Sequence, residues 1–266
     1  MYDPYNRNIS YLRISVTDRC NLRCQYCMPE GGVEMLPHSE ILTFDEIVEV
    51  VKYAVAMGVF KVRLTGGEPL VRRGIVDLVR MIANVEGIQD LAMTTNGILL
   101  STFAKDLKEA GLNRINISLD TLDAETFATI TRGGDINKVF EGIEAAKSVG
   151  LTPIKLNAVV KGHSRTPEAD ALRKFAADNG LEVRFIKQMS LEEGSFSVVE
   201  GGEGGDCPFC TRIRLTANGY IKPCLFNDIG YSVRELGARE ALYSAIRNKP
   251  ESGTTNTSGE FYNIGG

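Results

Sequence analysis

The chain has 266 residues, of which 43% are hydrophobic, and can therefore bury the core of one large domain. Its net charge of -4 and pI near 5.4 argue against a broad nucleic-acid-binding surface, and no apolar run is long enough to span a bilayer. The N-terminus lacks the pattern of a secretory signal, so we expect a cytoplasmic protein that binds neither nucleic acid nor membrane.

Runs of β-branched residues alternate with amphipathic stretches over most of the chain. The first amphipathic stretch begins with a capping box, in which Thr43 is followed three residues later by Glu46. We predict about six β/α units, with strands at 12–16, 62–65, 91–95, 114–118, 154–160 and 183–186 and further helices at 75–83, 103–110, 139–149 and 168–177. The fold class is therefore α/β, with a parallel sheet that is either open or curled into a barrel.

Conspicuous motifs follow the first four predicted strands. Cys20 comes after the first strand, TGGEP after the second, TTNG after the third and SLD after the fourth. Ligands of parallel α/β sheets bind at the carboxyl ends of the strands. We therefore expect these motifs to meet at one rim of the sheet.

The composition changes after Met189. The segment 190–206, SLEEGSFSVVEGGEGGD, is rich in Gly, Glu and Ser and is interpreted as a flexible, solvated connector. We predict a barrel domain at 1–189, this connector at 190–206 and a smaller region at 207–266.

The six cysteines form two sets of three. The first cysteine set has the spacing C-x3-C-x2-C and the second has C-x2-C-x13-C; they comprise Cys20, Cys24 and Cys27, and Cys207, Cys210 and Cys224. With only two histidines in the chain, any metal is held by sulfur. Three thiolates on a four-iron cluster leave one iron open to an external ligand. The alternatives are a zinc site completed by a distant residue, or incidental buried thiols.

The first cysteine set, with Tyr26 directly before its last member and GGEP at 66–69, resembles the radical S-adenosylmethionine superfamily. In that superfamily the open iron chelates S-adenosylmethionine, and the GGEP segment holds the methionine amino group. The second cysteine set, the stretch LRISVTDRCNLRCQYCMPEGG and the terminal FYNIGG resemble the GTP 3′,8-cyclase family of molybdenum-cofactor biosynthesis. This resemblance covers essentially the whole chain.

The resemblance implies a partial (β/α)6 TIM-like barrel with a small C-terminal iron-sulfur region. It implies an enzyme, a lyase, that cyclises GTP to (8S)-3′,8-cyclo-7,8-dihydroguanosine 5′-triphosphate at the start of molybdopterin assembly. The implied cofactors are two [4Fe-4S] clusters and S-adenosylmethionine. The implied partners are GTP and a low-potential electron donor, and a homodimer is left open.

The resemblance also assigns site residues. The first cysteine set would hold the cluster that binds S-adenosylmethionine, and the second cysteine set an auxiliary cluster. The expected contacts of S-adenosylmethionine are Tyr26, Gly66, Gly67, Glu68, Ser118 and Met189. The expected contacts of GTP are Arg13, Lys61, Arg63, Thr94, Lys155, Arg184, Arg212 and Arg214. Arg13 and the terminal Gly265 and Gly266, which the family threads into its active site, are expected to serve catalysis.

Two features depart from the family pattern. The segment between Met189 and Cys207 is short for the family, and Lys187 stands where an acidic residue is usual. An alternative is therefore a two-cluster radical enzyme of the same architecture that acts on another nucleotide or on a peptide. An alternative of another class is a non-catalytic iron-sulfur protein for electron transfer, although such a module favours fully ligated clusters.

Overall fold

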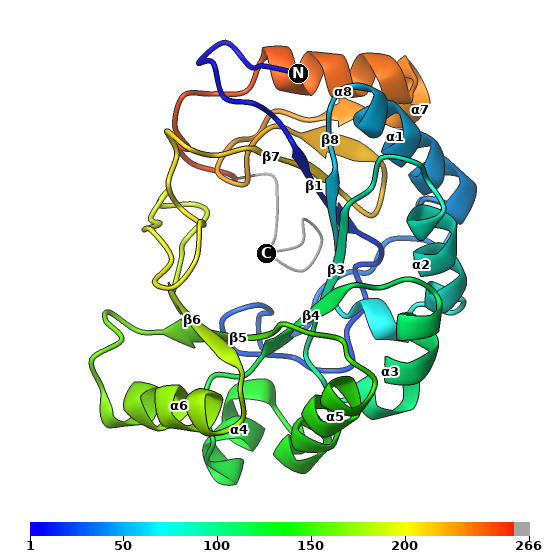
Figure 1. Ribbon diagram of the computed structural model, residues 1–266. Coiled ribbons are helices and arrows are strands. Elements are labelled where there is room, and N and C mark those ends of the chain that lie inside the picture. Colours follow the sequence, from blue (N-terminus) through cyan, green and yellow to red (C-terminus); the bar gives the residue numbers. More distant parts are fainter. Residues whose placement is uncertain (258–266) are drawn as a thin grey trace.

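The computed structural model describes residues 1–257. The strands in this part of the chain form one sheet in the order β6-β5-β4-β3-β2-β1-β7-β8-β9. The parallel strands are β1 (Tyr11–Ser15), β2 (Lys61–Thr65), β3 (Asp90–Thr95), β4 (Arg114–Ser118), β5 (Ile154–Val160), β6 (Glu182–Lys187) and β7 (Arg212–Leu215). The antiparallel strands β8 (Tyr220–Lys222) and β9 (Tyr231–Ser232) extend the sheet beyond β7. The sheet curls without closing, because β6 and β9 remain its edges (Figure 1), so the expected α/β partial barrel is confirmed.

Helices cover the outer side of the curled sheet (Figure 1). They are α1 (Phe44–Ala56), α2 (Ile75–Ala83), α3 (Leu100–Glu109), α4 (Ala124–Thr131), α5 (Ile136–Ser148) and α6 (Pro167–Asp178), with the short 3-10 helix η1 (Pro69–Val71) before α2. Near the C-terminus, α7 (Val233–Leu236) precedes α8 (Ala238–Arg247), which packs against α1. The predicted capping box is present, since Thr43 and Glu46 exchange hydrogen bonds at the start of α1.

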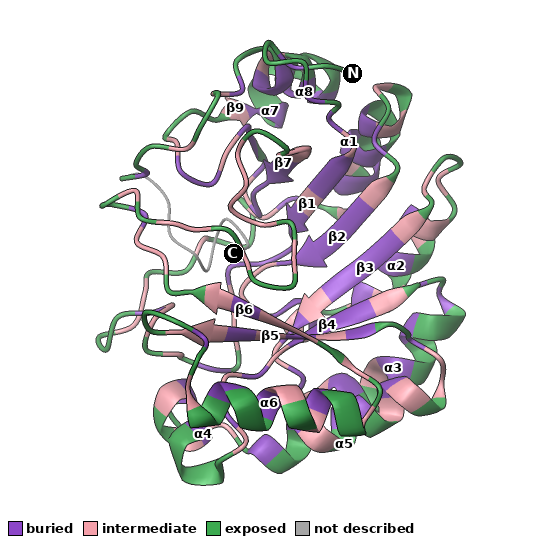
Figure 2. Ribbon diagram, turned by 60° about the vertical axis from the view of Figure 1, so that its left-hand side comes forward, coloured by how far each residue is buried: buried purple, intermediate pink, exposed green. Residues whose placement is uncertain are grey.

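The two faces of the strands carry different side chains. In β1, Leu12 and Ile14 are fully buried in the hydrophobic core between sheet and helices, while Tyr11 and Arg13 lie on the opposite face. Figure 2 shows the buried sheet and the exposed outer surfaces of the helices. Because the inner face of the barrel carries charged rather than apolar side chains, it is suited to enclose a polar ligand.

The segment 190–206 has many exposed residues, as expected of a solvated connector, but two of its side chains pack against the C-terminal region. Leu191 is buried against Leu225 and Phe226, and the rings of Phe196 and Phe226 stack 4.5 Å apart. An antiparallel bridge joins this segment to the edge strand β6. The segment therefore covers the open side of the barrel between β6 and β7 (Figure 1), because it offers both apolar side chains and backbone partners there.

The described residues contain no helix that is both long enough and apolar enough to cross a membrane.

Candidate active site

The two cysteine sets lie at opposite ends of the barrel. Cys20 follows the carboxyl end of β1, where the sequence places the other rim motifs. Strand β7 runs parallel to β1, with Arg212 in register with Tyr11, so Cys210 lies just before the amino end of that pair. Because β8 is antiparallel to β7, Cys224 returns to the same end. The sequence did not predict this separation.

A local turn shapes the loop of the first cysteine set. The backbone N–H groups of Cys27 and Met28 both donate to the carbonyl oxygen of Cys24, at 2.9 and 3.0 Å. From outside the loop, the guanidinium of Arg132 donates to the carbonyl oxygens of Arg23 and Met28, both at 2.9 Å. The protein itself thus holds the backbone that carries these thiols.

The predicted GGEP segment lies directly against the chain that leads to Cys20. Gly67 N–H donates to the carbonyl of Thr17 at 2.7 Å, and Glu68 N–H donates to that of Arg19 at 2.8 Å. A Cβ atom on Gly67 would lie 2.3 Å from the Arg19 oxygen, and one on Gly66 would lie 2.5 Å from the Thr17 oxygen. Both positions therefore require glycine, because any side chain would push the two segments apart.

The buried Glu68 side chain connects the ends of β2 and β3. Its carboxylate accepts hydrogen bonds from the Thr95 hydroxyl at 2.7 Å, from Asn96 N–H at 2.7 Å and from Leu70 N–H at 3.0 Å. Burial raises the pKa of Glu68 to about 7, although the hydrogen bonds that its carboxylate accepts act to lower the pKa. In this structure the Glu68 carboxylate therefore holds together the segments that follow β2 and β3.

The carboxylate of Asp120 lies beside the first cysteine set. The Tyr26 hydroxyl donates to Asp120 at 2.9 Å, and the same carboxylate accepts from Val159 N–H at 2.8 Å. Burial first, and then the neighbouring Asp120, raise the pKa of the Cys24 thiol to about 12 and that of Tyr26 well above its ordinary value. Ser118 precedes Asp120 by two residues at the end of β4.

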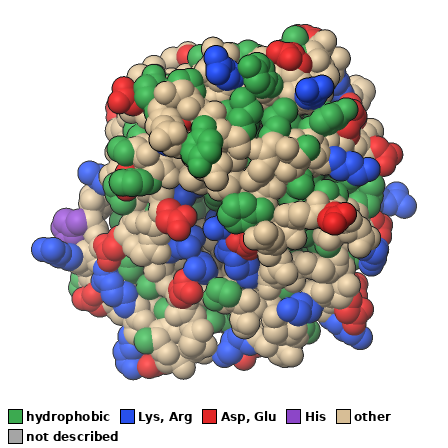
Figure 3. Space-filling view, turned by 45° about the horizontal axis from the view of Figure 1, so that its top comes forward, with side chains coloured by type: hydrophobic (Ala, Val, Ile, Leu, Met, Phe, Trp, Pro, Cys, Tyr) green, Lys and Arg blue, Asp and Glu red, His purple; other side chains and the backbone are tan. Residues whose placement is uncertain are grey.

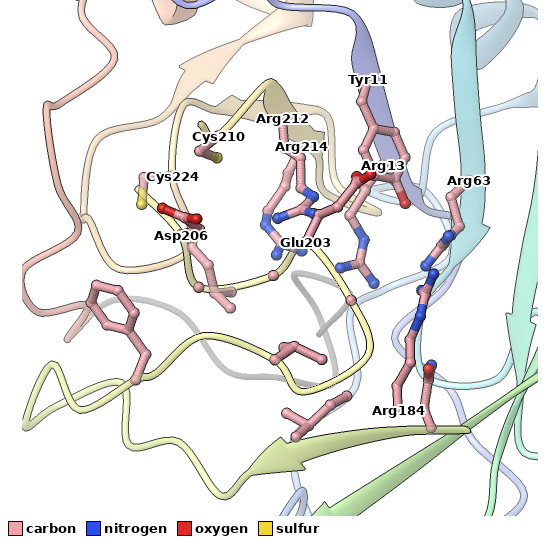
Figure 4. Close-up of a pocket in the computed structure, with 18 of the residues that line it drawn as sticks. Tyr11, Arg13, Arg63, Arg184, Glu203, Asp206, Cys210, Arg212, Arg214 and Cys224 are labelled. Atoms are coloured by element: carbon pink, nitrogen blue, oxygen red, sulfur yellow. The ribbon is translucent and has the colours of Figure 1, made fainter. Parts of the chain in front are cut away.

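A cavity of about 460 Å³ lies inside the barrel on the side of the second cysteine set, and no member of the first cysteine set lines it. Figure 3 shows Lys and Arg side chains gathered around a hollow in this face. Figure 4 shows arginines on both sides of the cavity, with Arg212 and Arg214 on the side of Cys210 and with the carboxylates of Glu203 and Asp206 in the same space. The second cysteine set and Met189 line the cavity, together with seven of the eight predicted GTP contacts: Arg13, Lys61, Arg63, Lys155, Arg184, Arg212 and Arg214. Thr94, the eighth, lies on β3 outside the cavity lining.

The cavity cations are desolvated and repel one another. Burial, followed by the nearby Arg214, lowers the pKa of Arg13 well below its ordinary value. Burial and Arg212 lower the pKa of Arg214 to about 10. Burial is also the largest cause of the lowered pKa of Arg63. Asp90, Glu203 and Asp206 also line the cavity, and Asp90 pairs with Lys61 and Arg114. Because the lining Lys and Arg side chains outnumber these carboxylates, the cavity is suited to bind a polyanion.

Sequence reasoning missed Tyr11, Asp90 and Arg114, which line this cavity near the start of the strands. The Tyr11 ring lies 5.4 to 5.6 Å from the cationic groups of Lys61, Arg63 and Arg212. Arg114 lines the cavity and forms two bonds to Asp90, at 2.8 and 2.6 Å. The alternation of polar residues along 114–118 could have identified Arg114 as inward-facing.

Two buried cations hold the segments of the second cysteine set together. Arg7 donates to the carbonyl of Cys207 at 2.8 Å and to that of Pro250 at 2.6 Å. Lys249, only 3% exposed, donates to the carbonyls of Arg212 at 2.8 Å and Pro223 at 2.6 Å. No local sequence signal marks either residue for this role.

The cations around the second cysteine set lower the pKa of the Cys210 thiol. Burial alone would raise the pKa of Cys210. The charges of Lys249 and Arg212 and a backbone hydrogen bond outweigh burial and lower it.

The donor set of both sites is sulfur alone. Within residues 1–257, no three His, Cys, Asp or Glu side chains are arranged to share a single metal ion. An iron-sulfur cluster is held differently, by one thiolate on each of several irons, and each set of three thiols suits it. Gly265 and Gly266 lie outside the described residues.

Comparisons with known proteins agree with this geometry. Residues 14–175 match the family model of the radical SAM superfamily. A GTP 3′,8-cyclase of Alkaliphilus oremlandii is 43% identical, with 94% of this chain and 93% of that protein covered; one of Thermodesulfovibrio yellowstonii is 39% identical, with 97% of each covered. Both alignments, over 299 and 311 residues, exceed the 266 residues of this chain, so the relatives carry insertions relative to it.

Solved structures show the same fold at low identity. Streptococcus suis SuiB bound to S-adenosylmethionine superposes with a TM-score of 0.66 at 17% identity, covering 89% of this chain and 66% of that one. The protein anSMEcpe with bound AdoMet gives 0.67 at 16% identity, covering 91% and 81%. From the motifs, the fold and the close relatives together, this chain belongs to the radical SAM superfamily and, within it, to the GTP 3′,8-cyclase family.

Proposed function

We propose that this chain cyclises GTP to (8S)-3′,8-cyclo-7,8-dihydroguanosine 5′-triphosphate, in the enclosed space between two iron-sulfur clusters. The observation that carries the proposal is the cavity of desolvated cations inside the barrel, which is lined by the second cysteine set and includes seven predicted GTP contacts. A triphosphate supplies further negative charge to a cavity whose cations outnumber its carboxylates. The family relatives are named for this reaction.

The first cysteine set would hold the cluster that binds S-adenosylmethionine. When bound, these two groups supply a reducing electron and a carbon-centred radical at the carboxyl end of the strands. The neighbouring carboxylate of Asp120 suits a positively charged sulfonium cofactor, and the chain of 66–68 lies beside the same loop. The apolar cluster of Leu191, Leu225 and Phe226 lies beside the cavity and would limit the access of water to the reacting groups from that side.

The second cysteine set would hold an auxiliary cluster at the opposite end of the cavity. Cys207, Cys210 and Cys224 line the cavity, so an iron left open there would face the bound nucleotide. In this arrangement the triphosphate binds the cations of β1, β2 and β7, and the base lies toward the second cysteine set. The ribose then lies between the two ends, where proximity favours intramolecular ring closure.

The net reaction can be tested by following the hydrogen atom that leaves C3′ of GTP. The C3′–H bond of GTP breaks, its hydrogen leaves on 5′-deoxyadenosine, a bond forms between C3′ and C8, and one electron and one proton complete the product. We expect anaerobic incubation of the reconstituted protein with S-adenosylmethionine, dithionite and 3′-deuterated GTP to place deuterium in 5′-deoxyadenosine and to yield an isomer of GTP.

The outcomes separate the alternatives. Formation of 5′-deoxyadenosine without deuterium or a GTP isomer would contradict the proposed substrate and favour another nucleotide or a peptide. Complete absence of 5′-deoxyadenosine, with clusters assembled, would favour a non-catalytic iron-sulfur protein.

A further inference from the structure

Asn116, in the middle of β4, has a fully buried side chain whose amide is unpaired. Neither its Oδ1 nor its Nδ2 atom has a hydrogen-bond partner among residues 1–257. Thr94, in register with it on β3, has a buried hydroxyl that likewise lacks a partner within the described chain. Buried polar groups are normally paired, because an unpaired one destabilises the folded state. These adjacent groups are therefore placed for a ligand.

The amide faces the barrel interior. Asn116 lies two residues after Arg114 on β4, and it is in register with Lys155 on β5. Arg114 and Lys155 line the cavity, and Asn116 lies next to them without being part of the lining. The intervening Ile115 and Ile117 are buried in the core on the opposite face. Because successive strand residues alternate between faces, Asn116 shares the face of Arg114.

The chemistry of this position differs from that of the cation cavity. Asn116 offers both donors and an acceptor and carries no charge, whereas phosphate oxygens only accept and would leave Oδ1 unpaired. A hydroxyl both donates and accepts and can satisfy the whole amide. Within a nucleotide, ribose hydroxyls carry this chemistry, and they lie between the phosphates and the base.

We infer that Asn116, assisted by the Thr94 hydroxyl, binds a ribose hydroxyl of the nucleotide substrate. The inference rests on the proposed function, which makes that nucleotide GTP. Lys155 on β5 lies beside Asn116. Ser118 follows Asn116 along β4, toward the end of the barrel that carries the first cysteine set. A ribose held at Asn116 is thus fixed between the phosphate-binding cations and the rim where S-adenosylmethionine binds.

Equilibrium binding of GTP, 2′-deoxyGTP and 3′-deoxyGTP to the anaerobic, cluster-loaded protein tests the inference. We expect the wild type to bind GTP about tenfold more tightly than at least one deoxynucleotide, and Asn116→Leu to lose that preference. The matched control is Lys155→Met, which removes a neighbouring cation. It should weaken all three nucleotides alike and keep the preference.

The thermal midpoint of the nucleotide-free protein gives a second readout. Because Asn116→Leu replaces an unpaired amide by an apolar group of similar size, we expect its midpoint to equal or exceed that of the wild type. If Asn116→Leu does not fold, Asn116→Ala replaces it in both measurements. A lower midpoint in both variants would show that the amide has a structural role and would overturn the inference.

The remaining outcomes are distinct. Equal affinity of the wild type for the three nucleotides, or a preference that survives in Asn116→Leu, would overturn the inference and leave the proposed function intact. Weakened S-adenosylmethionine binding with an unchanged hydroxyl preference would assign the amide to the cofactor's ribose instead. Absence of any GTP binding by the wild type would overturn both proposals.

Discussion

The two cysteine sets have opposite electrostatic surroundings. The first lies on one continuous loop beside Asp120, and burial and that carboxylate raise the pKa of Cys24 to about 12. The second is assembled from separate segments among Lys249 and arginines, which lower the pKa of Cys210 despite burial. We conclude that each end of the barrel matches the charge of its proposed ligand, a sulfonium cation at one end and a nucleotide anion at the other.

The largest expected effect separates the roles of the two sets. Cys24→Ala should abolish formation of 5′-deoxyadenosine, because the first cluster loses a thiolate. Cys210→Ala should keep 5′-deoxyadenosine formation but stop cyclisation of GTP. Chromatography of both products under reducing, oxygen-free conditions measures this, and cleavage that persists in Cys24→Ala would contradict the proposed division.

The next effect concerns the cation cavity. Arg63→Met removes one desolvated guanidinium, and we expect GTP affinity to fall about 10- to 100-fold, the value of one charge-assisted bond. S-adenosylmethionine affinity should change little, because Arg63 lies in the cavity of the second set. Calorimetry measures both affinities, with the exposed Arg73→Met as control. Equal losses for the two ligands would show that the two ends are not electrically distinct.

Lys249→Met tests the buried clamp on the second cysteine set. The variant leaves the Arg212 and Pro223 carbonyls without their donor, which costs roughly 1 to 3 kcal/mol for each buried group. We expect a lower thermal midpoint and loss of about half of the bound iron, confined to the second site. Full iron content with an unchanged midpoint would rule out this role.

Glu68 makes the first end of the barrel sensitive to pH. Its folded pKa of about 7 exceeds the ordinary 4.5, so the native state holds the proton more tightly than the unfolded state does. Its contribution to stability is complete below pH 4.5 and is lost as pH rises toward 7, by about 3 kcal/mol.

The thermal midpoints of wild type and Glu68→Gln between pH 5 and 8 measure this contribution. The variant loses the acceptor for Asn96 N–H at every pH, which gives a constant offset. We expect the wild type to lose stability relative to the variant as pH rises. Parallel pH profiles would contradict the raised pKa.

The smallest effect is expected at the exposed clamp on the first set. Arg132→Ala removes bonds to the carbonyls of Arg23 and Met28, but water can replace the donor at this surface. We expect a loss of about 1 kcal/mol or less and normal iron content. Loss of iron comparable to that of Lys249→Met would remove the contrast between the two clamps.

Local sequence patterns identified most of the fold. The predicted strands at 114–118 and 154–160 and the helix at 75–83 have the observed bounds, and the capping box at Thr43 marks the start of α1. The short β7, β8 and β9 were not predicted, because two- to four-residue strands carry too little periodicity.

The sequence by itself determined the spacing of the two cysteine sets and the glycines at 66 and 67, and the family resemblance supplied the cations that are proposed to bind substrate. Spacing, turn geometry and strand alternation are local properties, so they can be read along the chain. Only the tertiary structure decided that the cysteine sets lie at opposite ends, that Leu191 packs against the C-terminal region, and that Arg7 and Lys249 hold the backbone around the second cysteine set. These depend on pairings between residues distant in sequence, above all that of β7 with β1, which no local pattern specifies.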